Sequence, residues 1–373
     1  MKKKERLRGL VRSPKLLWDI LVQGSYDFTY DLMPVRMCHM SMTKRLNLLK
    51  AGSLFAYRRL KPWNWPLHMQ IELTNYCNLN CPVCPIGIRE MRRDPKSIDV
   101  SLFEHLMDEL GPYLLTASLW AWGEPLLHPR LEEILRIARK HPVVTLLSTN
   151  GQNLCEEAVI NALITAPPTY LIVAIDGLTD DTHSKFRVGA KLDPILSGVR
   201  RLAEIKRKER IELPILHMRY MVMKHNEHEV PRLKNFAREN GFDLLTLRTL
   251  SIIDSSRDTH QAFVPGSKEL RAYDYKGRNR IRRGDFICQQ PFWFPTVFAD
   301  GAVVACEQDF NAQQSFGKLS ADMSFADLWF GRQSMAIRRM IRDAPESLSF
   351  CRNCPYADRW AGACSVRAFN LID

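Results

Sequence analysis

Residues 69–84 of the chain read Met-Gln-Ile-Glu-Leu-Thr-Asn-Tyr-Cys-Asn-Leu-Asn-Cys-Pro-Val-Cys. The first six predict a short strand, and a loop with three cysteines follows it: Cys77, Cys81 and Cys84. Three thiolates on one loop can surround one face of an iron–sulfur cluster, because iron prefers soft ligands. They leave one iron of a four-iron cluster open, as chemistry at a metal requires. The alternative is a zinc site with a distant fourth ligand, which the C-x3-C-x2-C spacing disfavours because zinc ribbons usually use paired C-x2-C knuckles.

Five further strand-like runs follow the cysteine loop and alternate with amphipathic helical stretches. The strands are expected at 116–122, 143–148, 170–176, 214–222 and 242–249, and the helices at 101–114, 130–141, 156–166, 193–210 and 229–240. Ser101 and Asp193 are expected as N-caps and Gly241 as a helix stop. This alternation predicts an α/β fold of parallel strands with right-handed crossovers. Six units are compatible with an open barrel and with a doubly wound sheet, and in both the function lies at the carboxyl ends of the strands.

Short polar and turn-forming motifs stand at the ends of the next three strands. They are Gly-Glu-Pro at 123–125, Ser-Thr-Asn-Gly at 148–151 and Asp-Gly at 176–177. Each motif alone is a common turn or helix stop. Their order, each at the end of a successive strand behind a three-cysteine loop, makes a joint accident improbable.

Taken together, these motifs resemble the radical S-adenosylmethionine (radical SAM) superfamily. Gly-Glu-Pro looks like the family motif that contacts the methionyl amine of the cofactor, and His183 with Arg187 resembles its H-D-x-x-R element, with Ser184 in place of the Asp. One branch has a Ser where this chain has Ala174, so the contact of that Ser with the cofactor is absent or moved. The resemblance assigns seven residues to cofactor binding: Gly123, Glu124, Pro125, Ser148, Asn150, Asp176 and Arg187.

The resemblance also implies a first chemical step. A 4Fe–4S cluster on the three-cysteine loop would bind S-adenosylmethionine, and one electron from a flavodoxin- or ferredoxin-type reductant would cleave it to methionine and a 5′-deoxyadenosyl radical. That radical would abstract hydrogen from an unactivated C–H bond. Relatives in this branch modify ribosomal peptides, sulfatase residues, aminoglycosides and lipids, and the basic N-terminal residues suit a phosphate-bearing or lipid-like substrate. A lipid-like, phosphorylated or peptide substrate is therefore expected. The resemblance assigns no catalytic residue that touches the substrate.

Five of the ten cysteines lie in the C-terminal part of the chain. A hairpin is expected to begin at 294–299, turn at Asp300-Gly301 and end at a cysteine, and a helical stretch at 324–342 precedes a C-x2-C pair. This arrangement resembles the auxiliary-cluster module called SPASM, or its shortened twitch form. It implies one auxiliary 4Fe–4S cluster held by Cys288, Cys306, Cys351 and Cys354, with Cys364 as a substitute ligand or a thiol near the site. A structural zinc is the alternative.

The charge of the chain is concentrated at its N-terminus. The 373 residues carry a net charge of +12, with an ordinary globular composition of 46% hydrophobic residues. Residues 1–66 contain fourteen Lys and Arg against four acidic residues, which gives +10. We expect a helical basic arm that meets a membrane surface or an acidic partner, or that packs on the body with a solvated basic face. No nucleic-acid reader module is visible, so nucleic acid is not the expected partner.

The sequence thus predicts four segments: a basic arm at 1–66, a partial (β/α)6 radical SAM barrel at 67–252, a linker at 253–286 and a small auxiliary-cluster module at 287–373. No apolar run is long enough to span a membrane and no secretory signal is apparent, so we expect a cytoplasmic protein that contacts a membrane at most peripherally. Two alternatives to an enzyme are a non-catalytic iron–sulfur electron carrier or scaffold on the same fold, and a zinc-binding interaction protein. The intact cysteine loop and Gly-Glu-Pro argue against the first.

Overall fold

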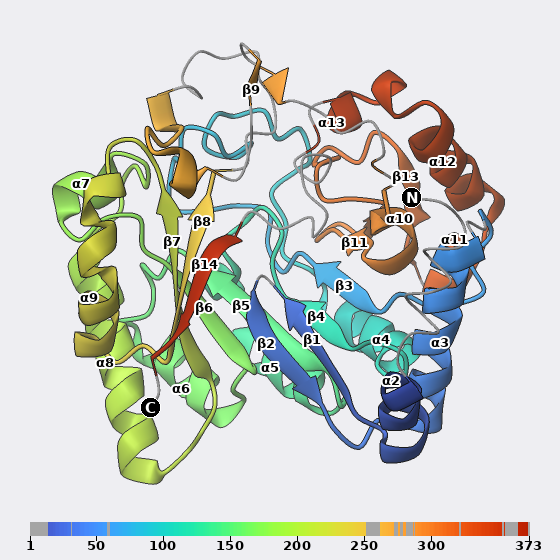
Figure 1. The fold of residues 1–373 in the computed structure, drawn as a ribbon, viewed down its shortest axis with the longest axis horizontal. Coiled ribbons are helices and arrows are strands. Elements are labelled where there is room, and N and C mark those ends of the chain that lie inside the picture. Colours follow the sequence, from blue (N-terminus) through green and yellow to red (C-terminus); the bar gives the residue numbers. More distant parts are fainter. Residues whose placement is uncertain are drawn as a thin grey trace.

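A single ten-stranded sheet forms the centre of the molecule (Figure 1). The computed structural model describes residues 14–30, 32–57, 60–250, 262–271, 275–276, 279–280, 286, 288–320, 322–352, 354 and 365–371. The strand order in the sheet is β13-β12-β11-β3-β4-β5-β6-β7-β8-β14. Its six middle strands are parallel and are β3 (His68–Ile71), β4 (Thr116–Ser118), β5 (Val144–Thr149), β6 (Tyr170–Ala174), β7 (Ile215–Val222) and β8 (Leu244–Thr249).

Helices cover the outer face of these six strands, as the alternating pattern predicted. They are α4 (Val100–Leu110), α5 (Leu131–Arg139), α6 (Glu157–Thr165), α8 (Leu192–Glu209), and η3 (Glu227–Arg232) with α9 (Leu233–Glu239). Between them lie the short helices η2 (Pro125–Leu127) and α7 (Asp180–Ser184). Because β3 to β8 are neighbours in chain order and their helices pack on one face, the sheet is an open (β/α)6 barrel. A doubly wound sheet would reverse its strand order at a switch point.

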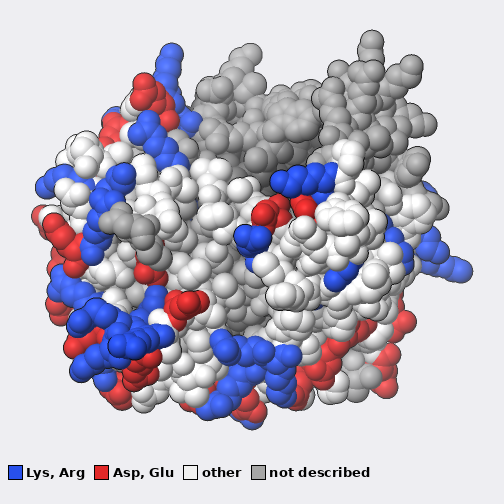
Figure 2. All heavy atoms as spheres, turned by 60° about the horizontal axis from the view of Figure 1, so that its bottom comes forward, with Lys and Arg blue, Asp and Glu red and all other residues white. Residues whose placement is uncertain are grey.

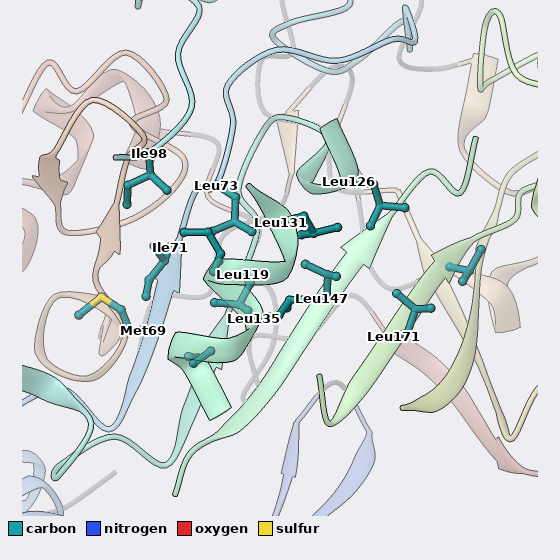
Figure 3. Close-up of a cluster of buried hydrophobic side chains, with 14 of the residues drawn as sticks. Met69, Ile71, Leu73, Ile98, Leu119, Leu126, Leu131, Leu135, Leu147 and Leu171 are labelled. Atoms are coloured by element: carbon teal, nitrogen blue, oxygen red, sulfur yellow. The ribbon is translucent and has the colours of Figure 1, made fainter. Parts of the chain in front are cut away.

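The main hydrophobic core lies between the outer face of the strands and the helices. In Figure 3, Leu131 and Leu135 of α5 point toward Leu147 of β5, and all three belong to one buried cluster with Ile71 of β3. Alternate residues of each strand point outward into this core, and the residues between them line the inside of the barrel. The carboxyl ends of the strands therefore present inward-facing polar side chains at one end of the barrel.

Two predicted helix starts differ from the structure. Asp99 is the N-cap of α4, where its carboxylate accepts hydrogen bonds from the Ser101 and Leu102 N–H groups, and Lys191 precedes α8. Ser101 and Asp193 are therefore wrong as N-caps and lie in the first turn instead, where the Asp193 carboxylate suits the positive end of the helix dipole. Gly241 ends α9 with a φ of +82°, in the left-handed conformation expected of it.

The C-terminal segment completes both edges of the barrel sheet. At one edge, β11 (Thr296–Val297) pairs in parallel with β3, and the hairpin to β12 (Ala302–Val304) turns at the predicted Asp300-Gly301 and continues to β13 (Ser315–Lys318). At the other edge, β14 (Ser365–Asn370) pairs antiparallel with β8. The remaining helices here are α10 (Gln290–Trp293), α11 (Phe325–Trp329), α12 (Arg332–Asp343), η6 (Pro345–Ser347) and α13 (Ser349–Arg352). The predicted linker contains η5 (Lys268–Leu270), β9 (Tyr275–Lys276) and β10 (Asn279–Arg280).

The N-terminal segment is helical only in part. Helical turns form α2 (Pro14–Trp18), η1 (Asp19–Gln23) and α3 (Met42–Tyr57), but β1 (Tyr26–Tyr30) and β2 (Met33–Met37) form a hairpin that the helical prediction missed. The burial of every second residue of β2 explains the strand, since it gives one face to the barrel and one to solvent. No helix in the described ranges is both long and apolar enough to cross a bilayer.

The β1–β2 hairpin lies against the inner side of the barrel. Met33 packs against inward-facing Leu146, Tyr170 and Ile172, and the Tyr170 hydroxyl donates to the Pro34 carbonyl at 3.0 Å. These contacts bury the inner face of the sheet near the amino ends of its strands. The opposite, carboxyl ends carry the polar motifs.

Figure 2 shows the face of the molecule that comes forward from the bottom of Figure 1. Charged side chains lie mainly toward the edge of this face.

Candidate functional site

The three-cysteine loop follows directly from β3 at the carboxyl end of the barrel. Cys81 is buried, Cys77 and Cys84 are half-buried, and the loop is so tight that a Cβ on Gly87 would lie 2.3 Å from the Cys81 carbonyl oxygen. Burial raises the pKa of the Cys77 thiol to about 12, and the nearby Glu124, Cys81 and Cys84 add to that rise. Neighbouring buried thiols lose their protons together only where cations neutralise them. The donor set therefore fits the irons of a cluster.

No three His, Cys, Asp or Glu side chains among the described residues are arranged around a point where a single metal ion would sit. Thiolates of an iron–sulfur cluster bind different irons and need not meet at one point. The three thiols of the loop form one small apolar cluster with Leu79 and Ala190.

Gly123 and Glu124 tie together the ends of neighbouring strands. A Cβ on Gly123 would lie 2.0 Å from the carbonyl oxygen of Thr74, so only glycine fits beside the start of the cysteine loop. The Glu124 carboxylate is buried and accepts hydrogen bonds from the Thr149 hydroxyl at 2.6 Å and the Asn150 N–H at 2.8 Å. The carboxylate thus holds the ends of β4 and β5 in register with each other. Pro125 follows it as the first residue of η2.

The end of β5 reaches the cysteine loop. Asn150 is buried, and its Nδ2 donates to Asn78 Oδ1 at 2.8 Å and approaches Cys77 Sγ at 3.5 Å. Ser148, two residues earlier, accepts a hydrogen bond from Arg219 of β7 at 3.4 Å, across the inside of the barrel. Both predicted residues therefore lie on the inner side of the carboxyl end, with Asn150 nearer the cysteines.

Buried Asp176 and half-buried Arg187 form an ion pair beside the cysteine loop. Arg187 Nε donates to Asp176 Oδ2 at 2.6 Å, and its Nη1 lies 4.0 Å from Cys81 Sγ. The other Asp176 oxygen accepts the Met221 N–H at 2.7 Å, which fixes the carboxylate against β7. Arg187 therefore places a positive charge beside the Cys81 sulfur, which favours the thiolate form against the burial that raises its pKa.

His183 is a structural partner of Asp176. The backbone N–H of Asp176 donates to His183 Nδ1 at 3.0 Å, and burial lowers the pKa of the imidazole to about 4. The ring is therefore neutral at physiological pH. A Cβ on Gly177 would lie 2.2 Å from the His183 backbone nitrogen, so Gly177 lets α7 pack closely on the end of β6.

The structure brings together the four predicted auxiliary ligands. Cys288 interacts electrostatically with Cys351 and Cys354, Cys306 interacts with Cys288 and Cys354, and burial raises the pKa of both Cys288 and Cys306 well above the usual range. The Cys306 thiol also lies 3.5 Å from Glu307 Oε2. This second group of crowded, buried thiols again fits a cluster of several cations. Cys364 lies outside the described residues.

A buried ion pair that the sequence did not reveal joins the barrel to the auxiliary module. Arg93 donates to the two oxygens of Glu72 at 2.7 and 2.8 Å, and the two side chains are 6% and 0% exposed. Arg93 Nε also donates to the Phe310 carbonyl at 2.7 Å, and its guanidinium lies 3.8 Å from the Phe298 ring centre. Glu72 accepts the Ala299 N–H at 3.0 Å. The signal in the sequence was an acid between Ile71 and Leu73 in a predicted strand, since an acid is rarely buried without a partner.

Two further contacts connect the strand-end motifs to the auxiliary module. Trp122, next to Gly123, donates from Nε1 to the carbonyl of Glu307 at 2.8 Å, beside the ligand candidate Cys306. Asn311 accepts the Arg92 N–H at 2.7 Å and donates to the Glu90 carbonyl at 3.1 Å. The loop after Cys84 and the turn after Cys306 therefore touch each other directly.

Comparisons with known proteins agree with this geometry. The model of the radical SAM superfamily matches residues 71–237, and the model of the iron–sulfur cluster-binding domain SPASM matches residues 288–355. The chain is 22% identical to mycofactocin maturase MftC of Mycobacterium tuberculosis, over 82% of this chain and 79% of the relative. It is also 22% identical to the PqqA peptide cyclase of Granulibacter bethesdensis, over 82% of this chain and 84% of the relative. Its fold is similar to that of Streptococcus suis SuiB bound to S-adenosylmethionine, with a TM-score of 0.59 and 14% identity over 84% of this chain and 77% of SuiB.

Proposed function

Because this chain belongs to the radical SAM superfamily and carries a SPASM cluster-binding domain, we propose that it cleaves S-adenosylmethionine reductively and abstracts hydrogen from a C–H bond of its substrate. The observation that supports this most directly is the group formed by Cys77, Cys81 and Cys84 with the Asp176–Arg187 pair beside them. A carrier or scaffold protein would need the cysteines but not the ordered strand-end residues around them.

The chain's own residues have distinct tasks in this proposal. Cys77, Cys81 and Cys84 hold a 4Fe–4S cluster, which when loaded supplies the electron that cleaves the sulfonium of S-adenosylmethionine. Arg187 stabilises negative charge on the Cys81 sulfur, and Glu124 fixes the strand ends that surround the cofactor. The seven residues predicted for cofactor binding remain the proposed set, and the Glu124 carboxylate also positions the strand ends through its hydrogen bonds with Thr149 and Asn150.

The second group, Cys288, Cys306, Cys351 and Cys354, is proposed to hold one auxiliary 4Fe–4S cluster for electron transfer. Four protein ligands leave no open position for substrate at that cluster, which favours an electron-transfer role. Direct contacts between the loop after Cys84 and the turn after Cys306 support a fixed arrangement of the two groups. A flavodoxin- or ferredoxin-type protein is the proposed source of electrons.

Two substrate classes are supported by different observations. The names of the relatives, a maturase and a peptide cyclase, favour a peptide. The basic residues at 1–66 favour a phosphorylated or lipid-like substrate, because Lys and Arg recognise phosphate. We propose a cytoplasmic enzyme whose N-terminal segment also contacts a membrane surface, which would bring a lipid-like substrate or a membrane-bound peptide to the barrel.

Anaerobic reconstitution of the full chain tests the proposed activity. About eight irons and eight sulfides per chain are expected, together with 5′-deoxyadenosine after addition of dithionite and S-adenosylmethionine. Bound zinc without iron would support the interaction-protein alternative, and two clusters without 5′-deoxyadenosine would support an electron carrier. Deuterium transfer into 5′-deoxyadenosine from candidate peptides and lipids then identifies the substrate class.

A further inference from the structure

Exposed apolar side chains are concentrated near the N-terminus of the described chain. Eleven large hydrophobic side chains are exposed among the described residues, and eight of them lie between residues 16 and 63 outside the β-hairpin: Leu16, Leu17, Trp18, Leu21, Val22, Met42, Leu46 and Trp63. Trp18 and Val22 are 57% and 55% exposed. We refer to these eight residues as the apolar patch. Single exposed hydrophobic residues are normal, but a concentration of this kind marks an interaction site.

The contacts of α3 place the α2–η1 part of the apolar patch beside this helix. Arg45 of α3 donates from Nη1 to the Leu21 carbonyl at 2.8 Å, and Ile20 of η1 packs into a buried cluster with Leu48 and Met40. The α2–η1 turns are therefore docked on α3, and the two lie beside each other in Figure 1. Ile20 is the buried residue of these turns, and their other apolar side chains point outward.

The exposed side of α3 carries two further members of the apolar patch. Met42 and Leu46 are one helical turn apart, and exposed Lys50 follows one turn later, so the three share one side of the helix. They span about 12 Å along the helix at 1.5 Å per residue. Trp63 joins the far end of this row, where its indole Nε1 donates to the Lys50 carbonyl at 2.9 Å.

The charges around the apolar patch are almost all positive. Asp19 is the one acidic residue in the sequences of α2, η1 and α3, whereas Lys15 and Lys50 are exposed there and Lys61 is exposed nearby. Residues 1–13, which lead into α2, contain six Lys and Arg and one Glu, a net charge of +5. A surface that combines Leu, Val and Trp with Lys matches an anionic bilayer, whose headgroups attract the cations while the apolar side chains enter the acyl boundary.

We infer that the apolar patch docks on an anionic lipid membrane, with α2 and η1 lying in the plane of the headgroups. This deepens the membrane contact proposed for residues 1–66, since it names the inserted side chains and the lipid charge. A second copy of the chain fits the surface less well, because a symmetric dimer would bring the two sets of cations together. The helical turns of α2 and η1 cover ten residues, a length that lies on a bilayer and does not cross it.

Vesicle co-sedimentation of the full-length, anaerobically reconstituted protein tests this inference. We expect the protein to sediment with phosphatidylcholine vesicles that contain phosphatidylglycerol, to bind pure phosphatidylcholine weakly, and to lose binding as salt is raised. Trp18→Glu is expected to reduce binding to anionic vesicles by at least about tenfold. The matched control is Met323→Glu, which places the same charge at an exposed apolar residue outside the apolar patch and should bind like the parent protein.

Several outcomes would overturn the inference. These are no binding of the parent protein to anionic vesicles, equal binding by Trp18→Glu, and a lipid-free dimer that Trp18→Glu dissociates. If Lys2→Glu/Lys3→Glu/Lys4→Glu abolishes binding while Trp18→Glu does not, the contact is electrostatic and the apolar patch has no part in it. Formation of 5′-deoxyadenosine in the absence of lipid, measured for each variant, tests the enzymatic proposal separately from the membrane contact.

Discussion

The two cysteine groups of this protein are built in different ways. Cys77, Cys81 and Cys84 share one loop, and tight turns within that loop position the thiols. The auxiliary cysteines come from separate segments between Cys288 and Cys354, and the β11–β12 hairpin brings one of them into place by pairing with the barrel strand β3. The first group is therefore local to one loop on the barrel, whereas the second depends on contacts between segments far apart in the sequence, including the pairing of β11 with β3. The difference predicts that breaking contacts between the barrel and the C-terminal segment should reduce cluster binding by the auxiliary cysteines and spare the cluster on the Cys77–Cys84 loop.

The largest effect is expected from Cys81→Ala. It removes one of three ligands of the proposed open cluster, so about four of eight irons should be lost and 5′-deoxyadenosine formation should fall at least about a thousandfold. Iron analysis and chromatography of the reaction measure both quantities. The matched control is Cys155→Ala, an exposed cysteine outside both groups, which should retain all the iron. Normal cleavage of S-adenosylmethionine by Cys81→Ala would contradict the assignment.

Cys306→Ala is expected to separate the two groups. The auxiliary cluster should be lost, with about four irons, while cleavage of S-adenosylmethionine to 5′-deoxyadenosine continues. Product formation should fall at least about a hundredfold if the auxiliary cluster accepts an electron from the substrate. Electron paramagnetic resonance of the reduced protein should show one cluster signal in place of two. One full turnover of product in this variant would exclude the electron-acceptor role.

The Glu72–Arg93 pair tests whether contacts between the barrel and the C-terminal segment are needed only for the auxiliary cluster. Arg93→Met leaves a buried carboxylate without its cation and is expected to cost about 3–5 kcal/mol in the free energy of unfolding. The double variant Glu72→Leu/Arg93→Met should recover most of this loss, because it removes both charges. Urea unfolding measures the stability, and iron content shows which cluster is lost first.

The control for this pair is Arg136→Met, which breaks an exposed ion pair with Glu132 on α5 and should change stability by less than about 0.5 kcal/mol. If Arg93→Met instead lost the cluster on the Cys77–Cys84 loop first, the view that this loop is the more independent of the two sites would be wrong.

Lys44 provides a pH-dependent test outside both cysteine groups. It is 1% exposed, its Nζ donates to the carbonyls of Leu114 and Pro142, and burial lowers its pKa to about 8. The unfolded chain binds this proton up to about pH 10.4, so it binds more protons than the folded chain above pH 8. The contribution of this group to the free energy of unfolding should therefore rise with pH, by roughly 1.5 kcal/mol between pH 8 and 9.5.

The comparison of the parent protein with Lys44→Met isolates the contribution of this group from other titrations. The difference in urea midpoint between the parent protein and Lys44→Met should shift in favour of the parent protein as the pH rises from 8 to 9.5. An identical pH dependence in the two proteins would show that Lys44 is solvated, and both cluster groups should keep their iron in either case.

The parts of the fold that sequence patterns predicted are those controlled by neighbouring residues. The six barrel strands follow from runs of apolar residues, and the hairpin at Asp300-Gly301 follows from the turn chemistry of two residues. The β1–β2 hairpin was missed because its alternation becomes clear only when the barrel supplies a surface for Met33 and Val35 to be buried against. The N-cap at Ser101 was wrong because the nearby Asp99 caps α4, and the one at Asp193 was wrong because Asp180, from another segment, accepts the first N–H of α8.

In the candidate site, too, some features follow from neighbouring residues and others from tertiary contacts. The cysteine loop and the strand-end motifs could be identified because each lies within a few consecutive residues. The partner of Glu72 could not, because Arg93 is 21 residues away and meets it only after the barrel and the hairpin have formed. The hydrogen bonds of Glu124 could not be predicted either, because Thr149 and Asn150, at the end of β5, meet its carboxylate only in the folded barrel.

The sequence by itself determined the order of the motifs, the ligand types and the charge of the N-terminal segment. Only the tertiary structure decided that the sheet is an open barrel, that cysteines from separate segments meet, and that exposed apolar side chains and exposed lysines lie together on α2 and α3. The physical reason is the distance along the sequence over which each interaction acts. Turn chemistry, periodicity and ligand identity are properties of short segments, whereas burial and ion pairing depend on which surfaces meet across the fold.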